Sequence, residues 1–119
     1  MTRPPADDRR GEAVRFAVLS HDHPRPHFDL LIEQGEVCRT WRLAAAPGDG
    51  PVAAEAIADH RPMYLSYEGP VSGDRGYVTR WDGGTCRVVG ESDAGLHVCF
   101  EGSKLCGEFT VGHEMTRRP

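Results

Sequence analysis

The sequence predicts an all-β protein, or a mostly β protein with one short helix, built as a small closed β-barrel of about eight strands. Short apolar or alternating segments recur along the chain, and turn residues separate them at intervals of roughly ten positions. Glycine and proline supply many of these turns, with 14 and 9 copies in 119 residues. Many short strands with regular turn signals are typical of a sandwich or a barrel.

The chain is expected to form a single domain with two short ends. Residues 1–13 are polar and contain two prolines, which indicates a flexible lead-in. The barrel domain is expected over 14–113, and 114–119 is expected to form a C-terminal tail. A chain of 119 residues buries roughly two-thirds of the surface that its unfolded form exposes, which is enough for a core without disulfides.

Two predicted strands flank a proline-containing turn near the start of the domain. Segments 14–20 (VRFAVLS) and 27–33 (HFDLLIE) are rich in apolar and β-branched residues, and HDHPRP separates them. A third strand is expected over 37–44 (VCRTWRLA), where the residues alternate between two faces and one face carries Val37, Arg39, Trp41 and Leu43. The glycine- and proline-rich segment 46–51 that follows predicts a loop.

The second half of the domain begins with the one candidate helix. Segment 51–59 (PVAAEAIAD) is alanine-rich with an early proline, which favours a short helix, although VAAEAIA also fits an irregular strand. Five strand-like segments follow: 63–69, 76–84, 85–92, 95–102 and 105–113. The glycine-containing sequences WDGGT, SDAG and EGSK are expected to be the turns between the last four.

Charge and composition narrow the class of protein. The net charge of −4 argues against nucleic-acid binding by bulk electrostatics but leaves room for local recognition of one phosphate. No apolar run approaches the roughly 18 residues of a membrane span, and the N-terminus lacks an apolar signal core. We therefore expect a cytoplasmic protein without membrane contact. Its four cysteines form no CxxC pair and are expected to be reduced.

Residues His21 to Glu33 (HDHPRPHFDLLIE) concentrate side chains that bind metals. His27 and Asp29 lie two residues apart and project from the same face of a strand. His21 would reach the same place if the turn folded it back. Two histidines and one carboxylate suit Mn²⁺, Fe²⁺ or Zn²⁺ and leave positions open for water or substrate. A histidine-rich polar turn without a metal remains the alternative.

A second candidate patch lies in ADHRPMY (58–64). His60 follows Asp59 and precedes a proline-containing turn, and Tyr64 is four residues further on. A histidine beside an aspartate can act as an oriented acid or base, but it can also be an ordinary surface histidine.

Three motifs together resemble the 3′-phosphoesterase domain of bacterial DNA ligase D. They are RFAVLSHDHPRPHFDLLIE followed by a tryptophan, then ADHRPMYLSYEG, then RGYVTRWDGGT. The family reads approximately FVVxxHDxxxxHxDFRLE, then DHPxxYxxFEG, then WDxGT. The resemblance runs from about Arg15 to Val111, and the motifs are specific because all three occur in order.

The resemblance implies a compact β-barrel that acts as a divalent-metal phosphoesterase, typically with manganese; Zn²⁺ or Co²⁺ are alternatives. Family members remove a 3′-phosphate or a terminal ribonucleotide from DNA, which leaves a 3′-hydroxyl for ligation. Carried over by position, the metal ligands are His21, His27 and Asp29. His60 corresponds to a histidine that contacts the scissile phosphate, Tyr64 is its neighbour, and Arg25 falls on an arginine of the family's loop.

The chain departs from the family at three cationic positions. The arginine two residues after the metal-binding aspartate is Leu31 here, a lysine falls at Ala45 or its neighbours, and an arginine falls near Val52. These groups grip the phosphate in the family. Four arginines of the chain are the candidate replacements for these cations: Arg25, Arg42, Arg61 and Arg75.

Two function classes and one weaker alternative follow. The first is a metal-dependent phosphoesterase acting on a DNA 3′ end (primer–template) or a small phosphate ester, as a monomer, alongside DNA repair proteins. The second is a weak or inactive metal-binding module of the same fold that binds nucleic acid or protein. The third is a non-haem iron oxygenase, because His27 and Asp29 followed by a distant His97 imitate a facial triad.

Overall fold

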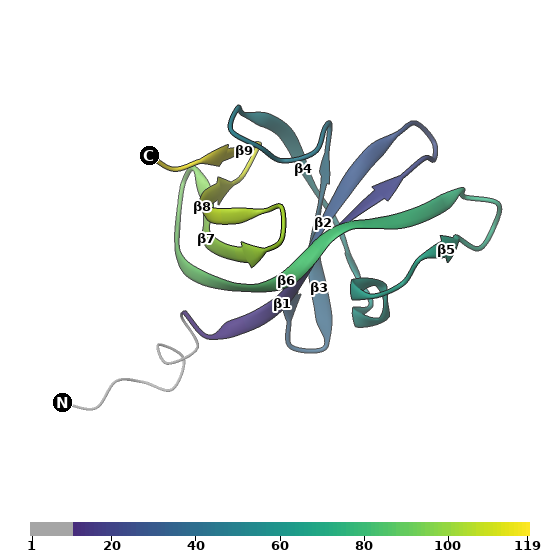
Figure 1. Ribbon diagram of the computed structural model, residues 1–119, viewed down its shortest axis with the longest axis horizontal. Helices are drawn as coiled ribbons and strands as arrows, with labels where there is room; N and C mark the ends of the chain where they lie inside the picture. Colours follow the sequence, from purple (N-terminus) through teal and green to yellow (C-terminus); the bar gives the residue numbers. More distant parts are fainter. Residues whose placement is uncertain (1–10) are drawn as a thin grey trace.

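The structure is a computed structural model that describes residues 11–119 (Figure 1). This part of the chain contains one 3₁₀ turn, η1 (Pro62–Leu65), and nine strands joined by turns and loops. The strands are β1 (Ala13–His21), β2 (His27–Gln34), β3 (Val37–Leu43), β4 (Val52–His60), β5 (Gly69–Pro70), β6 (Tyr77–Ser92), β7 (Gly95–Gly102), β8 (Cys106–Val111) and β9 (Glu114–Arg117). Within it, no helix is long and apolar enough to cross a membrane.

Eight of the strands close into a barrel. Neighbouring strands follow the order β1-β2-β3-β4-β9-β8-β7-β6, and β6 pairs with β1 to complete the ring. Every pairing is antiparallel, so all barrel strands run up and down. The short β5 adds to the edge of β6 outside this ring. The prediction of an all-β closed barrel of about eight strands is confirmed.

The predicted helix over 51–59 is wrong, because this segment is β4. It pairs with β3 on one side and with β9 on the other, so neighbouring strands supply its backbone hydrogen bonds. A nine-residue alanine-rich helix is marginal in water, and tertiary pairing outweighs the local preference. Ala54 is buried against the core, whereas Glu55 and Ala56 are exposed.

The predicted turn at WDGGT is also wrong, because 77–92 form one strand. Strand β6 pairs with β1 along one edge and with β7 along the other, which keeps it extended through this sequence. Gly84 allows β6 and β7 to approach each other closely. A Cβ on Gly84 (φ +155°) would lie 2.5 Å from the carbonyl oxygen of Glu101 on β7. The turns expected at SDAG and EGSK do connect β6 to β7 and β7 to β8.

Two further segments differ from expectation. Segment 63–69 is the 3₁₀ turn η1 and a loop, with strand pairing only at Gly69. The expected tail 114–119 contains β9, which joins β4 to β8 and so completes the ring. Residues 1–10 of the expected lead-in lie outside the described residues, and Ala13 already belongs to β1.

Side chains of β1 and β2 alternate between two apolar cores. Phe16 and Val18 point into the barrel, where Phe16 packs edge-to-face on Phe100 at 4.9 Å between ring centroids. Ala17 and Leu19 face the outside, into a smaller cluster completed by Leu31, Cys38, Leu65 and Val78. Burial on both faces explains why these strands read as continuous apolar runs. The outer cluster forms the base on which the candidate site lies.

The cysteines are free thiols, as expected for reduced residues. Cys38 and Cys86 are buried, and burial raises the pKa of the Cys86 thiol to about 12. These two side chains therefore behave as small core residues.

Candidate functional site

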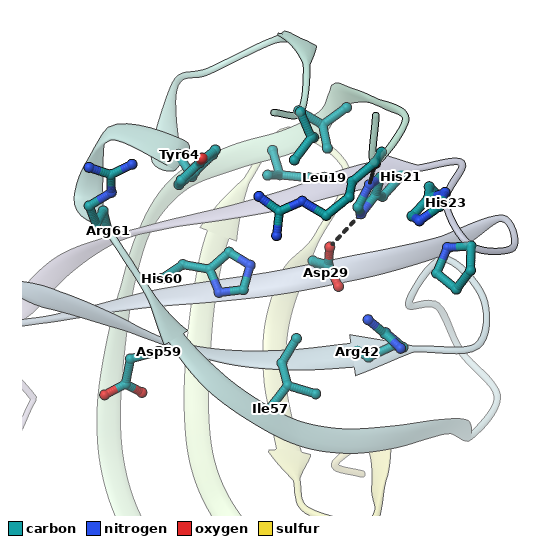
Figure 2. Close-up of a pocket in the computed structure, with 14 residues that line it drawn as sticks. Leu19, His21, His23, Asp29, Arg42, Ile57, Asp59, His60, Arg61 and Tyr64 are labelled. Atoms are coloured by element: carbon teal, nitrogen blue, oxygen red, sulfur yellow. Dashed lines mark hydrogen bonds and ion pairs between the residues drawn. The ribbon is translucent and has the colours of Figure 1, made fainter. Parts of the chain in front are cut away.

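A cavity of about 390 Å³ opens on the outer face of the barrel wall, between strands β1 to β4 and the η1 to β6 connection (Figure 2). Its polar lining comes from four separate parts of the chain: His21, His23, Asp29, Arg42, Asp59, His60, Arg61, Tyr64 and Arg75. Leu19 and Val78 of the outer apolar cluster contribute its base. Polar groups that converge over an apolar base are typical of a small-ligand site.

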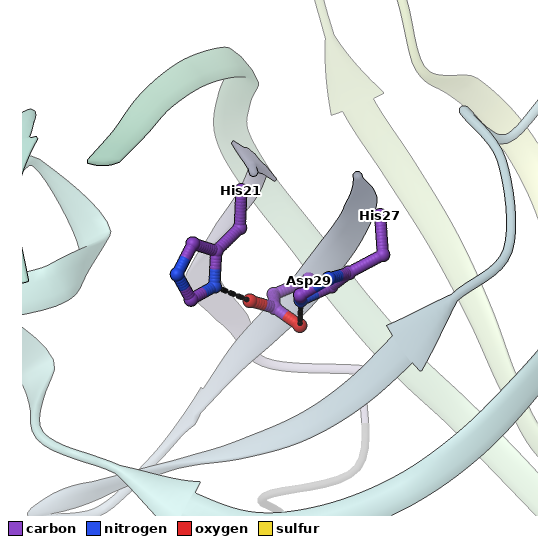
Figure 3. Close-up of side chains that lie close together, drawn as sticks. All are labelled: His21, His27 and Asp29. Atoms are coloured by element: carbon purple, nitrogen blue, oxygen red, sulfur yellow. Dashed lines mark ion pairs between the residues drawn. The ribbon is translucent and has the colours of Figure 1, made fainter. Parts of the chain in front are cut away.

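The three predicted metal ligands meet at the edge of this cavity: His21 and Asp29 line it, and His27 lines the small groove next to it (Figure 3). His21 and His27 are direct partners across the β1–β2 ladder, and Asp29 follows two residues later on the same face of β2. Their donor atoms all lie within 4.8 Å of one another. His27 Nε2 is 3.2 Å from Asp29 Oδ1, and His21 Nδ1 is 3.5 Å from Asp29 Oδ2.

Main-chain carbonyls orient both imidazoles. His21 Nε2 donates to the carbonyl of Arg75 at 2.8 Å, and His27 Nδ1 donates to the carbonyl of Arg25 at 2.8 Å. Since a carbonyl oxygen only accepts, the protons lie on these two nitrogens. The opposite nitrogens, His21 Nδ1 and His27 Nε2, then present lone pairs toward Asp29. An orienting hydrogen bond on the far nitrogen is the usual support of a metal-binding histidine.

The buried part of this group lacks a hydrogen-bonding partner. His27 Nε2 and Asp29 Oδ1 are buried side-chain atoms without a hydrogen bond among the described residues. With the proton of His27 on Nδ1, both atoms are acceptors, and they face each other at 3.2 Å. A cation between or beside two buried acceptors at this distance would satisfy both of them. The residues therefore fit a divalent ion held by two nitrogens and one carboxylate.

His60 and Tyr64 lie in the same cavity as the metal-binding group (Figure 2). His60 ends β4, and its Nδ1 donates to the carbonyl of Ala58 at 3.1 Å. Its Nε2 is therefore the nitrogen available to a ligand. Tyr64 belongs to η1 and packs edge-to-face on His60, with ring centroids 5.9 Å apart. His60 and Tyr64 lie in one motif of the sequence, and His21, His27 and Asp29 lie in another. The structure brings the two motifs together.

Arg25 lies apart from this cavity. Its side chain is exposed and lines a small neighbouring groove together with Pro24, His27 and Arg42. Its contact with the metal group is made by its main-chain carbonyl, which holds His27. The structure does not bring the Arg25 side chain into the cavity that contains His60.

Three other arginines line the cavity: Arg42, Arg61 and Arg75. The sequence names them as cations but does not place them, because they come from β3, from the start of η1 and from the β5–β6 loop. The pairing of β2 with β3 would have located one of them, because Arg42 is the direct partner of Asp29 in that ladder. Cα partners in an antiparallel pair point to the same face.

The iron oxygenase hypothesis required His97 beside His27 and Asp29. His97 lies on β7, where Nε2 is 2.9 Å from Ser92 Oγ and Nδ1 is 3.3 Å from Thr110 Oγ1. It does not join the group of His21, His27 and Asp29. The proposed facial triad is therefore not formed.

Comparisons with known proteins show the family of the chain. A family model for the DNA ligase D 3′-phosphoesterase domain matches residues 19–113. The multifunctional non-homologous end joining protein LigD of Pseudomonas aeruginosa is 29% identical over 118 residues, which cover 90% of this chain and 14% of that protein. LigD proteins of Mycobacterium bovis and Mycobacterium tuberculosis are 29% identical over 122 residues, 91% of this chain and 16% of theirs.

The chain thus spans about one-seventh to one-sixth of the length of these relatives. The matched region contains the metal-binding group, His60, Tyr64 and the three cavity arginines. The fold, the motifs in order and the family match lead to one conclusion: this chain belongs to the DNA ligase D 3′-phosphoesterase domain family.

Proposed function

We propose that this protein is a divalent-metal phosphoesterase that processes DNA 3′ ends, removing a 3′-phosphate or a terminal ribonucleotide to leave a 3′-hydroxyl. The observation that carries the proposal is the pair of buried, unpartnered acceptors in the His21, His27 and Asp29 group. This group opens on a cavity that also holds His60 and three arginines. Membership of the phosphoesterase family supports the same reading.

The ion expected in this group is Mn²⁺, with Zn²⁺ or Co²⁺ as alternatives. Two imidazole nitrogens and one carboxylate suit such ions and leave positions for water and substrate. A divalent ion held there would neutralise phosphate charge and lower the pKa of a bound water. The carbonyls of Arg25 and Arg75 keep His27 and His21 turned toward Asp29, so the ligands are oriented before any ion binds.

His60 is the proposed general acid of the reaction. Its Nδ1 donates to the carbonyl of Ala58, which leaves Nε2 available to a phosphate ester in the cavity. In its imidazolium form His60 carries a proton on Nε2 as well as on Nδ1. As the water oxygen bonds to phosphorus and the phosphorus–oxygen ester bond breaks, the leaving 3′-oxygen takes the Nε2 proton, and the attacking water releases its own proton to solvent. Tyr64 packs on the imidazole and limits its rotation.

A binding module of the same fold is the second candidate function. It is favoured by the three family cations that are absent, at Leu31, Ala45 and Val52, and by the net charge of −4. Such a module would bind metal and a nucleic-acid or protein partner without turnover. Separate measurements of metal content and hydrolysis distinguish it from the enzyme.

The test uses primer–template DNA that ends in a 3′-phosphate or in a single 3′-ribonucleotide. Protein stripped of metal should not act on either end, and added Mn²⁺ should restore release. His27→Ala should lose stoichiometric metal and at least about 100-fold in rate, because one ligand of three is removed. Stoichiometric metal in His27→Ala would overturn the metal site. Full metal binding without release by the unchanged protein would favour the binding module.

A further inference from the structure

We propose that Arg42 and Arg75 form the phosphate clamp of this site and that this clamp selects a terminal phosphate monoester over a phosphodiester. The inference rests on the proposed function and goes beyond it, because it assigns substrate binding to two residues and chooses one of the two 3′ ends. It follows from two observations: the two arginines lie close to Asp29 and His21, and the cations that grip the phosphate in the family are absent.

Arg42 lies beside the metal group with its charge uncommitted. It is the Cα partner of Asp29, and both side chains line the same cavity (Figure 2). Asp29 faces the two imidazoles of His21 and His27, and Arg42 makes no ion pair or side-chain hydrogen bond with the described residues. A guanidinium that faces a cavity without a protein partner is available to an anionic ligand.

The substitution at Leu31 explains why the cation comes from β3. Leu31 is fully buried in the outer apolar cluster, where it packs with Leu65 and Val78. Its position on the Asp29 face of β2 therefore contributes to the base of the site and carries no charge. The next place from which a side chain reaches Asp29 on this face is directly across the ladder, and Arg42 occupies it.

Hydrogen bonds hold Arg75 at the cavity. Its guanidinium donates to the carbonyl of Ser72 at 2.7 Å and to Ser72 Oγ at 3.2 Å. Its carbonyl accepts from His21, which links its backbone directly to the metal group. Asp22 Oδ1 accepts from the backbone N–H of Tyr77 at 2.8 Å, which ties the end of this loop to the end of β1. Nη1 of Arg75 makes no hydrogen bond with the described residues.

Arg61 is not assigned to the clamp. All three cavity arginines are exposed, but Arg61 lies beside Tyr64 at the end of the cavity away from Asp29 (Figure 2). Arg42 is instead the ladder partner of Asp29 on β2, and the carbonyl of Arg75 accepts a hydrogen bond from His21 on β1.

The number of cationic groups matches a phosphate monoester. Near pH 7 a monoester carries about −1.5 to −2 charges on three terminal oxygens. A diester carries one charge per phosphate on two non-bridging oxygens. Arg42, Arg75 and the ion expected at His21, His27 and Asp29 offer three cationic groups, one for each terminal oxygen of a monoester. A diester leaves one of them without a charged partner.

Binding without turnover tests the clamp directly. The probes are fluorescent DNA oligonucleotides with a 3′-phosphate, a 3′-hydroxyl or a 3′-ribonucleotide, and their anisotropy is measured with metal-free protein in a chelator. Arg42→Ala and Arg75→Ala should each weaken binding of the 3′-phosphate probe by about tenfold or more, which corresponds to about 1.4 kcal/mol. Binding of the 3′-hydroxyl probe should not change. The affinity of Arg42→Lys for the 3′-phosphate probe should lie between those of the unchanged protein and Arg42→Ala. Lysine keeps the charge but loses the two parallel donors of the guanidinium.

Arg39→Ala is the matched control. Arg39 lies on the same strand, carries the same charge and stacks over Trp41 at 5.0 Å, and it lines a different cavity. It should bind all three probes like the unchanged protein. Thermal unfolding midpoints of all variants verify that each is folded.

Hydrolysis with Mn²⁺ then tests selectivity. The unchanged protein should favour the 3′-phosphate end, and each clamp variant should lower its kcat/KM on that end more than on the 3′-ribonucleotide end. Equal losses on both ends would overturn the monoester selectivity. Variants that match Arg39→Ala in binding and hydrolysis would overturn the clamp while the phosphoesterase stands. Arginine-dependent binding of the 3′-phosphate probe without hydrolysis of either end would uphold the clamp and reject the proposed phosphoesterase.

Discussion

At the scale of single residues, the site depends on which imidazole nitrogen carries the proton. Carbonyl acceptors hold Nε2 of His21, Nδ1 of His27 and Nδ1 of His60. The free nitrogens of His21 and His27 face Asp29, and that of His60 is available in the same cavity. Backbone geometry thus divides chemically identical side chains into two proposed metal ligands and one proposed acid.

His60→Ala separates these two roles. Because His60 is not part of the metal group, this variant should retain stoichiometric Mn²⁺. Its rate of 3′-phosphate release should fall by about 10²–10⁴-fold, the usual contribution of a general acid. Metal content by elemental analysis and single-turnover release are the measurements. An unchanged rate would identify His60 as an ordinary partly exposed histidine.

At the scale of elements, the β7–β8 turn is held by a carboxylate from β6. Asp82 is buried and accepts backbone N–H groups of Ser103, Lys104 and Leu105 at 3.1, 2.8 and 2.7 Å. Burial alone would raise the pKa of Asp82, but these hydrogen bonds, together with one from Gly83, outweigh it and lower the pKa. The WDGGT sequence therefore supplies a turn-capping side chain from within a strand.

Asp82→Ala should destabilise the barrel by about 1–3 kcal/mol, since buried N–H groups lose their acceptor. Because the folded pKa lies below the unfolded one, the contribution of Asp82 is present above about pH 4 and is lost as pH falls through the folded pKa. Urea unfolding of the variant should therefore lose part of the acid dependence seen in the unchanged protein. Asp93→Ala, an exposed aspartate in the β6–β7 turn, is the control. Equal unfolding free energies for both variants would contradict this role.

At the scale of the whole molecule, β9 joins the first four strands to the last ones. It pairs with β4 through Val52 and Ala53 and with β8 through Phe109 to Val111. Without it, the β4 edge and the β8 edge would both be unpaired. Met115 of β9 is 1% exposed and belongs to the barrel core.

Met115→Ala should therefore cost about 2–5 kcal/mol of unfolding free energy, as for other large core side chains. Glu114→Ala, which changes the exposed neighbour on the same strand, should cost about 0.5 kcal/mol or less. Chemical denaturation of the two variants is the measurement. A small loss in Met115→Ala would show that the C-terminal segment is the loose tail that its sequence alone suggests.

The sequence by itself determined the class of fold and which residues form the candidate metal site. Strand periodicity and turn residues are local properties, and His27 and Asp29 share a face because any strand repeats every two residues. The ordered motifs also placed His60 and Tyr64 in one site by resemblance, and the structure puts them in one cavity with Asp29.

Only the tertiary structure decided the rest, because it depends on partners distant in sequence. Pairing with β3 and β9 made 52–60 a strand against its helical preference, and pairing with β1 and β7 kept 77–92 unbroken. Ladder register placed Arg42 opposite Asp29, and two hydrogen bonds between the end of β1 and the β5–β6 connection brought Arg75 to the same cavity. Register and loop docking are set by long-range contacts, so no local pattern could have located these arginines.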